Sequence, residues 1–96
     1  MRVRWTTPAL RDLESIGSHI ERDNSAAVAA RVVTTVFDQV DNLATFPHIG
    51  RAGRVPNTRE LVVVETPYIV PYRVRDNEIE ILAVFHSARQ WPENFH

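Results

Sequence analysis

The sequence predicts one α+β domain in which a hairpin of two helices covers one face of a small antiparallel sheet. Over residues 7–43, apolar residues recur at the spacings of three and four that are typical of amphipathic helices. Over residues 58–86, three extended runs are joined by short turns, as in a β-meander. A chain of 96 residues fits a single core, so we expect one domain over residues 1–96. Packing two helices on one face of an antiparallel sheet buries the apolar residues of the helices and of the strands in one core.

The first elements are a short strand and an amphipathic helix. Residues 2–6 alternate charged residues with Val3 and Trp5, which predicts a short N-terminal strand. Thr7 and Pro8 then resemble an N-cap residue followed by the first residue of a helix. The helix carries a narrow apolar stripe of Leu10, Leu13, Ile16 and Ile20. We therefore expect one side of this helix to pack on the rest of the domain.

A second helix follows after a short polar break. Ser25 can cap its start, and Phe46-Pro47 stops the helical pattern. Its apolar face is wide and rich in valine, with Val28, Val32, Val33, Val36, Phe37, Val40 and Leu43. Valine costs roughly a few tenths of a kcal/mol relative to alanine in a helix, so this segment depends on tertiary packing. The two helices together predict a helical hairpin.

The second half predicts a loop and three strands. Residues 48–57 form a loop rich in glycine and arginine, and the strands are expected at 58–65, 68–75 and 78–86. The intervening turns are short enough for antiparallel hairpins, which gives a three-stranded meander. Pro71 lies in the middle strand and lacks an N–H group, so we expect a bulge or a local irregularity there.

Composition excludes several functions. The chain has no cysteine, and its four histidines lack the spacing of a metal site, so we expect neither a metal nor a cofactor. All eleven basic residues are arginine, which rules out any mechanism that depends on lysine. The formal net charge of −1 disfavours a dedicated binder of duplex DNA.

The chain also lacks the signals of export or membrane insertion. The N-terminal residues do not form the apolar run of a signal peptide, and no apolar stretch approaches the roughly 20 residues that span a bilayer. We therefore expect a cytoplasmic protein without membrane contact.

The end of the third strand holds a concentrated group of functional side chains. His86, Arg89 and Trp91 bring an imidazole, a guanidinium and an indole to the end of a core strand. Side chains at such a position are held by a rigid element and still face solvent, which suits binding or catalysis.

Motifs along nearly the whole chain resemble those of a known family. They are Trp5-Thr6 and the stretches at 46–51 (FPHIGR), 59–63 (RELVV), 67–74 (PYIVPYRV) and 81–92 (ILAVFHSARQWP). Together with the order of elements, they are similar to the ParE/RelE superfamily of type II toxin-antitoxin toxins, and to its ParE branch in particular. The resemblance implies a small toxin that is neutralised by a cognate antitoxin, whose C-terminal segment wraps it. It also implies a hetero-oligomer with an antitoxin dimer, in which DNA is contacted only through the antitoxin.

Within that superfamily, the resemblance leaves two targets. Members similar to ParE inhibit DNA gyrase, and our leading hypothesis is such an inhibitor that acts by binding. We expect the target to contact Arg73, His86, Arg89 and Trp91. The antitoxin is expected to place an amphipathic helix or an extended segment over the helical hairpin and a sheet edge. Its acidic side chains would face an arginine loop of Arg51, Arg54 and Arg59.

The alternative is a RelE-like endonuclease that cleaves mRNA on the ribosome. Glu60 or His86 could accept the proton of the 2'-hydroxyl, His86 could supply the acid, and Arg73 with Arg59 could hold the phosphate. The sequence lacks the lysines and the C-terminal tyrosine that such nucleases use. A third hypothesis is an inactive relative that is retained for interaction alone.

Two of these residues also have purely structural interpretations. Arg73 could pair with Glu78 or Glu80 across the hairpin, since cross-strand ion pairs are common. His86 could hydrogen-bond a backbone group at the end of its strand.

Overall fold

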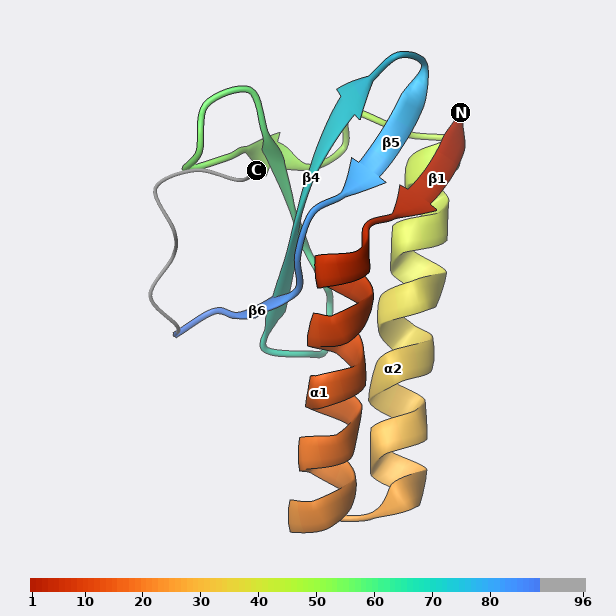
Figure 1. The fold of residues 1–96 in the computed structure, drawn as a ribbon, viewed down its shortest axis with the longest axis vertical. Coiled ribbons are helices and arrows are strands. Elements are labelled where there is room, and N and C mark those ends of the chain that lie inside the picture. Colours follow the sequence, from red (N-terminus) through yellow and green to blue (C-terminus); the bar gives the residue numbers. More distant parts are fainter. Residues whose placement is uncertain (89–96) are drawn as a thin grey trace.

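The helical hairpin and the sheet form two layers of an α+β fold, as the sequence predicts (Figure 1). The structure is a computed structural model that describes residues 1–88. The helical layer consists of α1 (Thr7–Asp23), α2 (Ala26–Asp41) and the short 3₁₀ helix η1 (Asn42–Ala44). The strands are β1 (Arg2–Trp5), β2 (Arg51–Ala52), β3 (Arg59–Val62), β4 (Tyr68–Arg75), β5 (Glu78–Ile81) and β6 (Phe85–His86).

The sheet is mixed. Its strand order is β1-β5-β4-β3-β2, and β6 pairs with the other end of β4. The meander of β3, β4 and β5 is antiparallel, which confirms that part of the prediction. The sheet is not antiparallel throughout, because β1 runs parallel to β5, with Val3 opposite Ile79 and Trp5 opposite Ile81. The connection between these two strands includes both helices and strands β2 to β4, so it is long enough for a parallel pair.

The expected third strand is divided by a bulge opposite Pro71. Pairing stops after Tyr72↔Ile81 and resumes at Ile69↔Phe85, so residues 82–84 lie opposite only Val70 and Pro71. This confirms the irregularity predicted at Pro71. The buried backbone of the bulge is held by α1, because the Val84 N–H donates to Asp12 Oδ2 at 3.0 Å.

The caps of the two helices differ in how well they were predicted. Ser25 caps α2 as expected, and its hydroxyl accepts the Val28 N–H at 3.1 Å. The cap of α1 is Thr6, so the assignment of Thr7 to that position was wrong by one residue. Thr6 has extended backbone angles and also donates its hydroxyl to the Ile81 carbonyl at 2.6 Å. This bond to β5 fixes where the strand ends and the helix begins.

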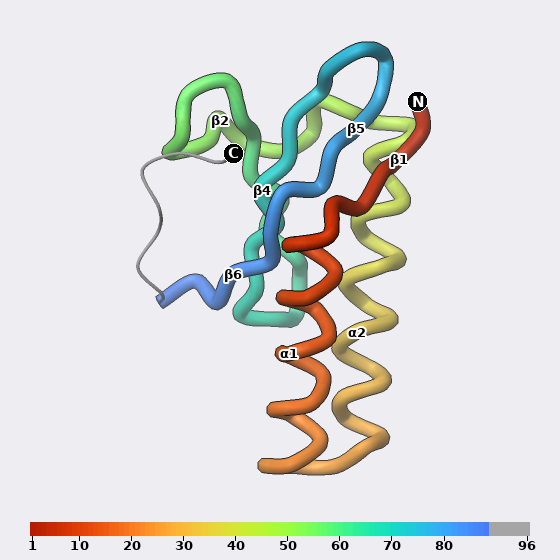
Figure 2. The backbone as a smooth tube through the Cα atoms, in the orientation of Figure 1, coloured from red at the N-terminus to blue at the C-terminus, as the bar shows by residue number. Residues whose placement is uncertain are grey.

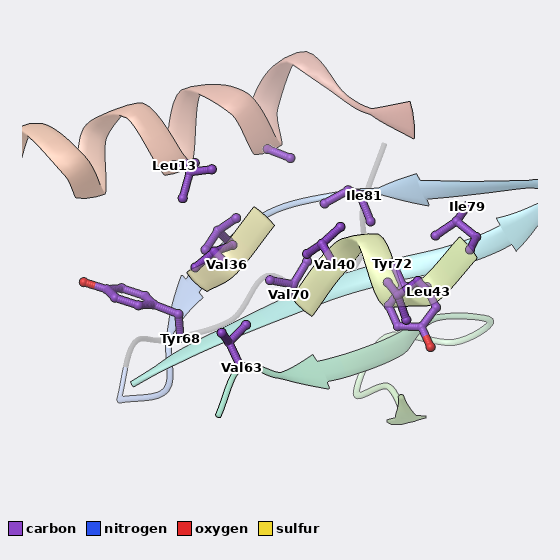
Figure 3. Close-up of a cluster of buried hydrophobic side chains, with 12 residues drawn as sticks. Leu13, Val36, Val40, Leu43, Val63, Tyr68, Val70, Tyr72, Ile79 and Ile81 are labelled. Carbon is purple, nitrogen blue, oxygen red and sulfur yellow. The ribbon is translucent and has the colours of Figure 1, made fainter. Parts of the chain in front are cut away.

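The core lies between the helices and the facing side of the sheet (Figure 3). Its largest buried side chain is Tyr72, which is fully enclosed. The phenol donates to the Pro47 carbonyl and accepts the Gly50 N–H, both at 2.9 Å. Burial raises the pKa of Tyr72, which keeps the phenol a donor. A Cβ atom at Gly50 would lie 2.6 Å from the Tyr72 ring, so the loop approaches the core closely only because this residue is glycine.

The helical hairpin extends beyond the sheet. Figure 2 shows that the turn between α1 and α2 lies at the end of the hairpin that is farthest from β5. The two helices approach each other closely at Gly17, where a Cβ atom would lie 3.3 Å from the Val33 side chain. Among the helices of residues 1–88, none has the length and apolarity needed to cross a membrane.

Candidate functional site

The outer face of the sheet, turned away from the helices, is rich in paired charges. Alternation along the strands places Tyr68 and Tyr72 toward the helices and Arg73 on the outer face. The register Arg4↔Glu80↔Arg73 then brings three charged side chains into one row across β1, β5 and β4. Arg51, which is opposite Glu60, also lies on this outer face, whereas Arg59 is opposite Tyr72 and lies on the helix side.

Arg73 pairs with Glu80, as its structural interpretation predicts. Its Nε donates to Glu80 Oε1 at 2.7 Å, and the Arg73 side chain is 23% exposed. Glu80 is buried and also contacts Arg4 and Arg75. The hydrogen bond from Arg73 holds the pKa of Glu80 below its ordinary value, against the opposing effect of burial. Arg73 thus keeps a buried carboxylate charged.

Arg73 also lines a pocket of about 370 Å³ together with Arg59 and His48. Arg59 is fixed there, because its Nη1 donates to the carbonyls of His48 and Gly50 at 3.1 and 2.9 Å. The register places Arg59 opposite Tyr72 on the helix side and Arg73 on the outer face, so the two arginines reach this pocket from opposite sides of the sheet. The sequence does not indicate a part for His48 in this site, because no local pattern places residue 48 near residue 73.

Glu60 is buried and anchors the arginine loop. It is 1% exposed, and its Oε1 accepts from Arg51 Nε at 3.1 Å and Nη2 at 3.0 Å. Its Oε2 accepts the Arg54 backbone N–H at 2.9 Å. The side chains of Arg51 and Arg54 remain about half exposed, at 53% and 49%. The carboxylate therefore orients two arginines toward solvent.

His86 lies on the helix side of the sheet, at the end of β4 opposite to Arg73. It is paired with Tyr68, and the two rings meet edge to face with centroids 5.7 Å apart. Its Nδ1 accepts the Ala88 N–H at 3.2 Å, which confirms the interpretation that it bonds the backbone at a strand end. It also lines a polar pocket of about 390 Å³ with His19 and Arg22 of α1.

The structure does not bring the proposed catalytic residues together. Tyr68, the partner of His86, and Arg73 are five positions apart along β4, which is roughly 16 Å at 3.3 Å per residue. The side chains of Arg73 and His86 also lie on opposite faces of the sheet. Arg89 and Trp91, the other predicted target contacts, lie outside the described residues. Within residues 1–88, no three His, Asp or Glu side chains gather closely enough to hold a metal ion.

A second surface is an apolar groove along the helical hairpin. It has a volume of about 570 Å³ and is lined by residues of both helices, including Leu10, Ala29 and Phe37. Leu10 is 45% exposed although it is apolar. Glu14 and Glu21 also line this groove. Its shape and composition suit an amphipathic helix that carries basic side chains.

A helical hairpin on a mixed sheet is the fold that this chain shares with chains from two solved type II toxin-antitoxin systems. Residues 3–91 match the family of ParE toxins of the type II toxin-antitoxin system parDE. The chain belongs to this family, within the ParE/RelE superfamily.

Two relatives carry the names of toxins, and one of these names belongs to the RelE branch. One relative is Y4kP of Sinorhizobium fredii, which is named as a toxin. It is 51% identical over 92 residues, and the match covers 96% of this chain and 94% of the relative. This chain is also 38% identical over 88 residues to toxin RelE2 of Caulobacter vibrioides, covering 92% and 97% of the two chains.

Chains from two solved toxin-antitoxin systems share the fold of this protein. A chain of the chromosomal ParDE system of P. aeruginosa superposes with a TM-score of 0.83 at 31% identity, covering 90% of this chain and 95% of that one. A chain of the RelBE2 toxin-antitoxin complex of Mycobacterium tuberculosis gives a TM-score of 0.64 at 25% identity, covering 88% and 95%. The family is therefore established, whereas these names do not choose between the two targets.

Proposed function

We propose that this toxin acts by binding, as an inhibitor of DNA gyrase. The observation that carries the proposal is the separation of Arg73 and His86, which lie on opposite faces of the sheet. General acid-base catalysis needs groups within hydrogen-bond reach of one reacting centre, about 3 Å away. A protein interface of about 800 Å² per partner is on the order of 30 Å across, so a partner that wraps around the sheet can contact both residues.

The local partners of these residues also favour a binding role. Arg73 is held by Glu80, His86 contacts Tyr68 and the Ala88 backbone, and Glu60 is enclosed by its arginines. Each side chain is thus held rigidly by its neighbours, as a binding surface requires. We keep Arg73, His86, Arg89 and Trp91 as the proposed gyrase contacts.

The antitoxin would occupy other parts of the molecule. We assign its amphipathic helix to the hairpin groove, where basic side chains would meet Glu14 and Glu21. Its acidic side chains would meet the half-exposed Arg51 and Arg54, with Arg59 at the base of the same loop. The proposed assembly is a hetero-oligomer with an antitoxin dimer, which alone contacts DNA. We place the toxin in the cytoplasm, where both candidate targets reside.

The second candidate remains an endonuclease that acts on mRNA at the ribosome. The observation in its favour is the pocket that contains Arg59, Arg73 and His48. Arg59 or Arg73 could hold the scissile phosphate there, and His48 could transfer a proton. This arrangement differs from the proposed pair of Arg73 and His86, because His48 takes the place of His86.

A parallel assay with purified toxin separates the two functions. Gyrase and relaxed plasmid report inhibition of supercoiling, and ribosomes programmed with mRNA report cleavage. We expect supercoiling to stop while the mRNA stays intact. Cleaved mRNA with unaffected gyrase would replace the leading proposal with the alternative.

A further inference from the structure

The edge of the sheet at β3 is only partly covered. Strand β2 pairs with Arg59 and Glu60 alone, so among the described residues no strand lies beside the rest of β3 on that side. The Val63 N–H donates to the Tyr68 carbonyl at 3.1 Å, which turns the Val63 backbone toward β4. Because backbone direction alternates along a strand, the N–H and C=O groups of Val62 and Val64 point away from the sheet. These two residues form an open edge.

A side chain from α2 occupies one position of this edge. Gln39 donates Nε2 to the Val64 carbonyl at 3.1 Å, and its Oε1 accepts the Val64 N–H at 2.8 Å. A primary amide offers the same donor and acceptor as a peptide group, so Gln39 takes the place that a neighbouring strand would have. At Val62, no residue of 1–88 forms a hydrogen bond with the outward N–H or C=O.

Apolar side chains surround the open edge. Phe46, Ile49, Val62 and Val64 are 59%, 62%, 46% and 65% exposed. Ile49 lies between two hollows, one of about 550 Å³ shared with Val62 and Val64 and one of about 410 Å³ shared with Phe46. Proteins normally protect an exposed edge with charge or proline, and this edge has an apolar border instead.

We infer that this edge binds an extended segment of a partner protein by strand addition. The segment would pair with the backbone of Val62, displace Gln39 from Val64, and carry apolar side chains at alternate positions beside these valines. Arg51, which lines the same hollow and is 53% exposed, favours a segment that ends in a carboxylate. Arg51 does not disfavour a second copy of this chain, since two-fold antiparallel pairing would keep the two Arg51 side chains at opposite ends of the paired edges, so the test below treats self-association as a separate outcome.

The inference deepens the proposed function, because it names the shape and chemistry of a protein segment that the toxin would recruit. The experiment requires neither gyrase nor antitoxin, so its failure would leave the gyrase proposal standing. The probe is a short synthetic peptide in which valine and threonine alternate, with a glutamate near one end. Its control is the same peptide with N-methylated amides at the pairing positions, which keeps the side chains and removes the backbone donors.

Binding is followed by amide chemical shifts of the labelled toxin as peptide is added up to millimolar concentration. We expect the first peptide to shift Val62 and Val64, and the N-methylated peptide to bind at least about tenfold more weakly, because several backbone hydrogen bonds are lost. Equal affinity for both peptides, or no shift with either, would overturn the inference. Self-association that accounts for the same shifts in the absence of peptide would overturn it in favour of a second copy.

Three variants sharpen the result. Gln39→Ala removes the competing amide and should strengthen peptide binding about three- to tenfold. Val62→Lys should abolish binding, since an edge lysine blocks strand addition. Leu10→Lys is the matched control, because Leu10 is 45% exposed and Val62 46% exposed, yet Leu10 lies in the hairpin groove. Weaker binding by Gln39→Ala, or equal loss in both lysine variants, would contradict strand addition at this edge.

Discussion

Arg73 donates a hydrogen bond of 2.7 Å to Glu80, which joins a half-buried cation to a carboxylate that is 6% exposed. Arg4 and Arg75 approach the same carboxylate from the neighbouring strands. Glu80 is therefore the centre of a charged cluster on the outer face of the sheet. Arg73 has a structural task in this cluster, and a substitution there tests stability as well as function.

The cluster makes stability depend on pH. Hydrogen bonding and charge lower the pKa of Glu80 in the folded state, so the unfolded state takes up this proton first as the pH falls. The stabilisation is complete above the unfolded pKa of about 4.3 and is lost as the pH falls through the lower folded pKa. We expect the stability difference between the wild type and Glu80→Gln to shrink between pH 7 and the acid range. Urea unfolding of both proteins at several pH values measures this, and a constant difference would contradict it.

Glu60 should contribute more to stability than an ordinary surface carboxylate. Glu60→Ala leaves Arg51 and the Arg54 N–H without their buried acceptor, and we expect a loss of about 3 kcal/mol in the free energy of unfolding. The control Glu21→Ala changes an exposed residue of α1 and should stay within about 0.5 kcal/mol. Similar small losses for both variants would show that Glu60 does not anchor the loop.

The separation of Arg73 and His86 predicts independent contributions to gyrase inhibition. Residues more than about 10 Å apart usually contribute additively, whereas members of one catalytic unit do not. We expect Arg73→Ala and His86→Ala each to weaken inhibition partially, and the double variant to show the product of the two factors. Inhibition curves for the three variants provide the measurement, and thermal melting confirms that each is folded. Complete loss of activity in one well-folded single variant would instead indicate chemistry.

The hairpin groove predicts a selective defect in antitoxin binding. Leu10→Lys places a charge in the apolar groove and should weaken binding of the cognate antitoxin at least about tenfold, because a buried charge is costly. Inhibition of gyrase by the free toxin should be unchanged. Thr34→Lys, on an exposed position of α2 outside that groove, is the control. If both variants bind antitoxin like the wild type, the antitoxin uses another surface.

The local elements could be predicted from the sequence, because their signals are local. Helical spacing and the Ser25 cap located α2, and the short turns located the antiparallel meander. The missing N–H of Pro71 predicted the irregularity beside it. The error at the cap of α1 arose because Thr6 and Thr7 are equivalent by residue type. In the structure, Thr6 accepts the Ala9 N–H and donates to the Ile81 carbonyl, which is 75 residues away and which no local pattern indicates.

The site depended on long-range register, which periodicity does not contain. Nothing local indicates that β1 lies parallel to β5, or that His48 shares a pocket with Arg73. Alternation alone would leave Glu60 half exposed, and it is buried because residues of the preceding loop return to cover it. Pairing of Arg73 with an acidic residue on the next strand was foreseeable, since the two strands form a hairpin.

The most direct test of binding as the mode of action is a stoichiometric titration. Purified toxin is added to gyrase at several fixed gyrase concentrations, and supercoiling of relaxed plasmid is measured. For a tight-binding inhibitor, we expect the toxin concentration needed for half inhibition to rise in proportion to the gyrase concentration. No inhibition at any ratio, together with cleavage of many mRNA molecules by each toxin on ribosomes, would contradict the account.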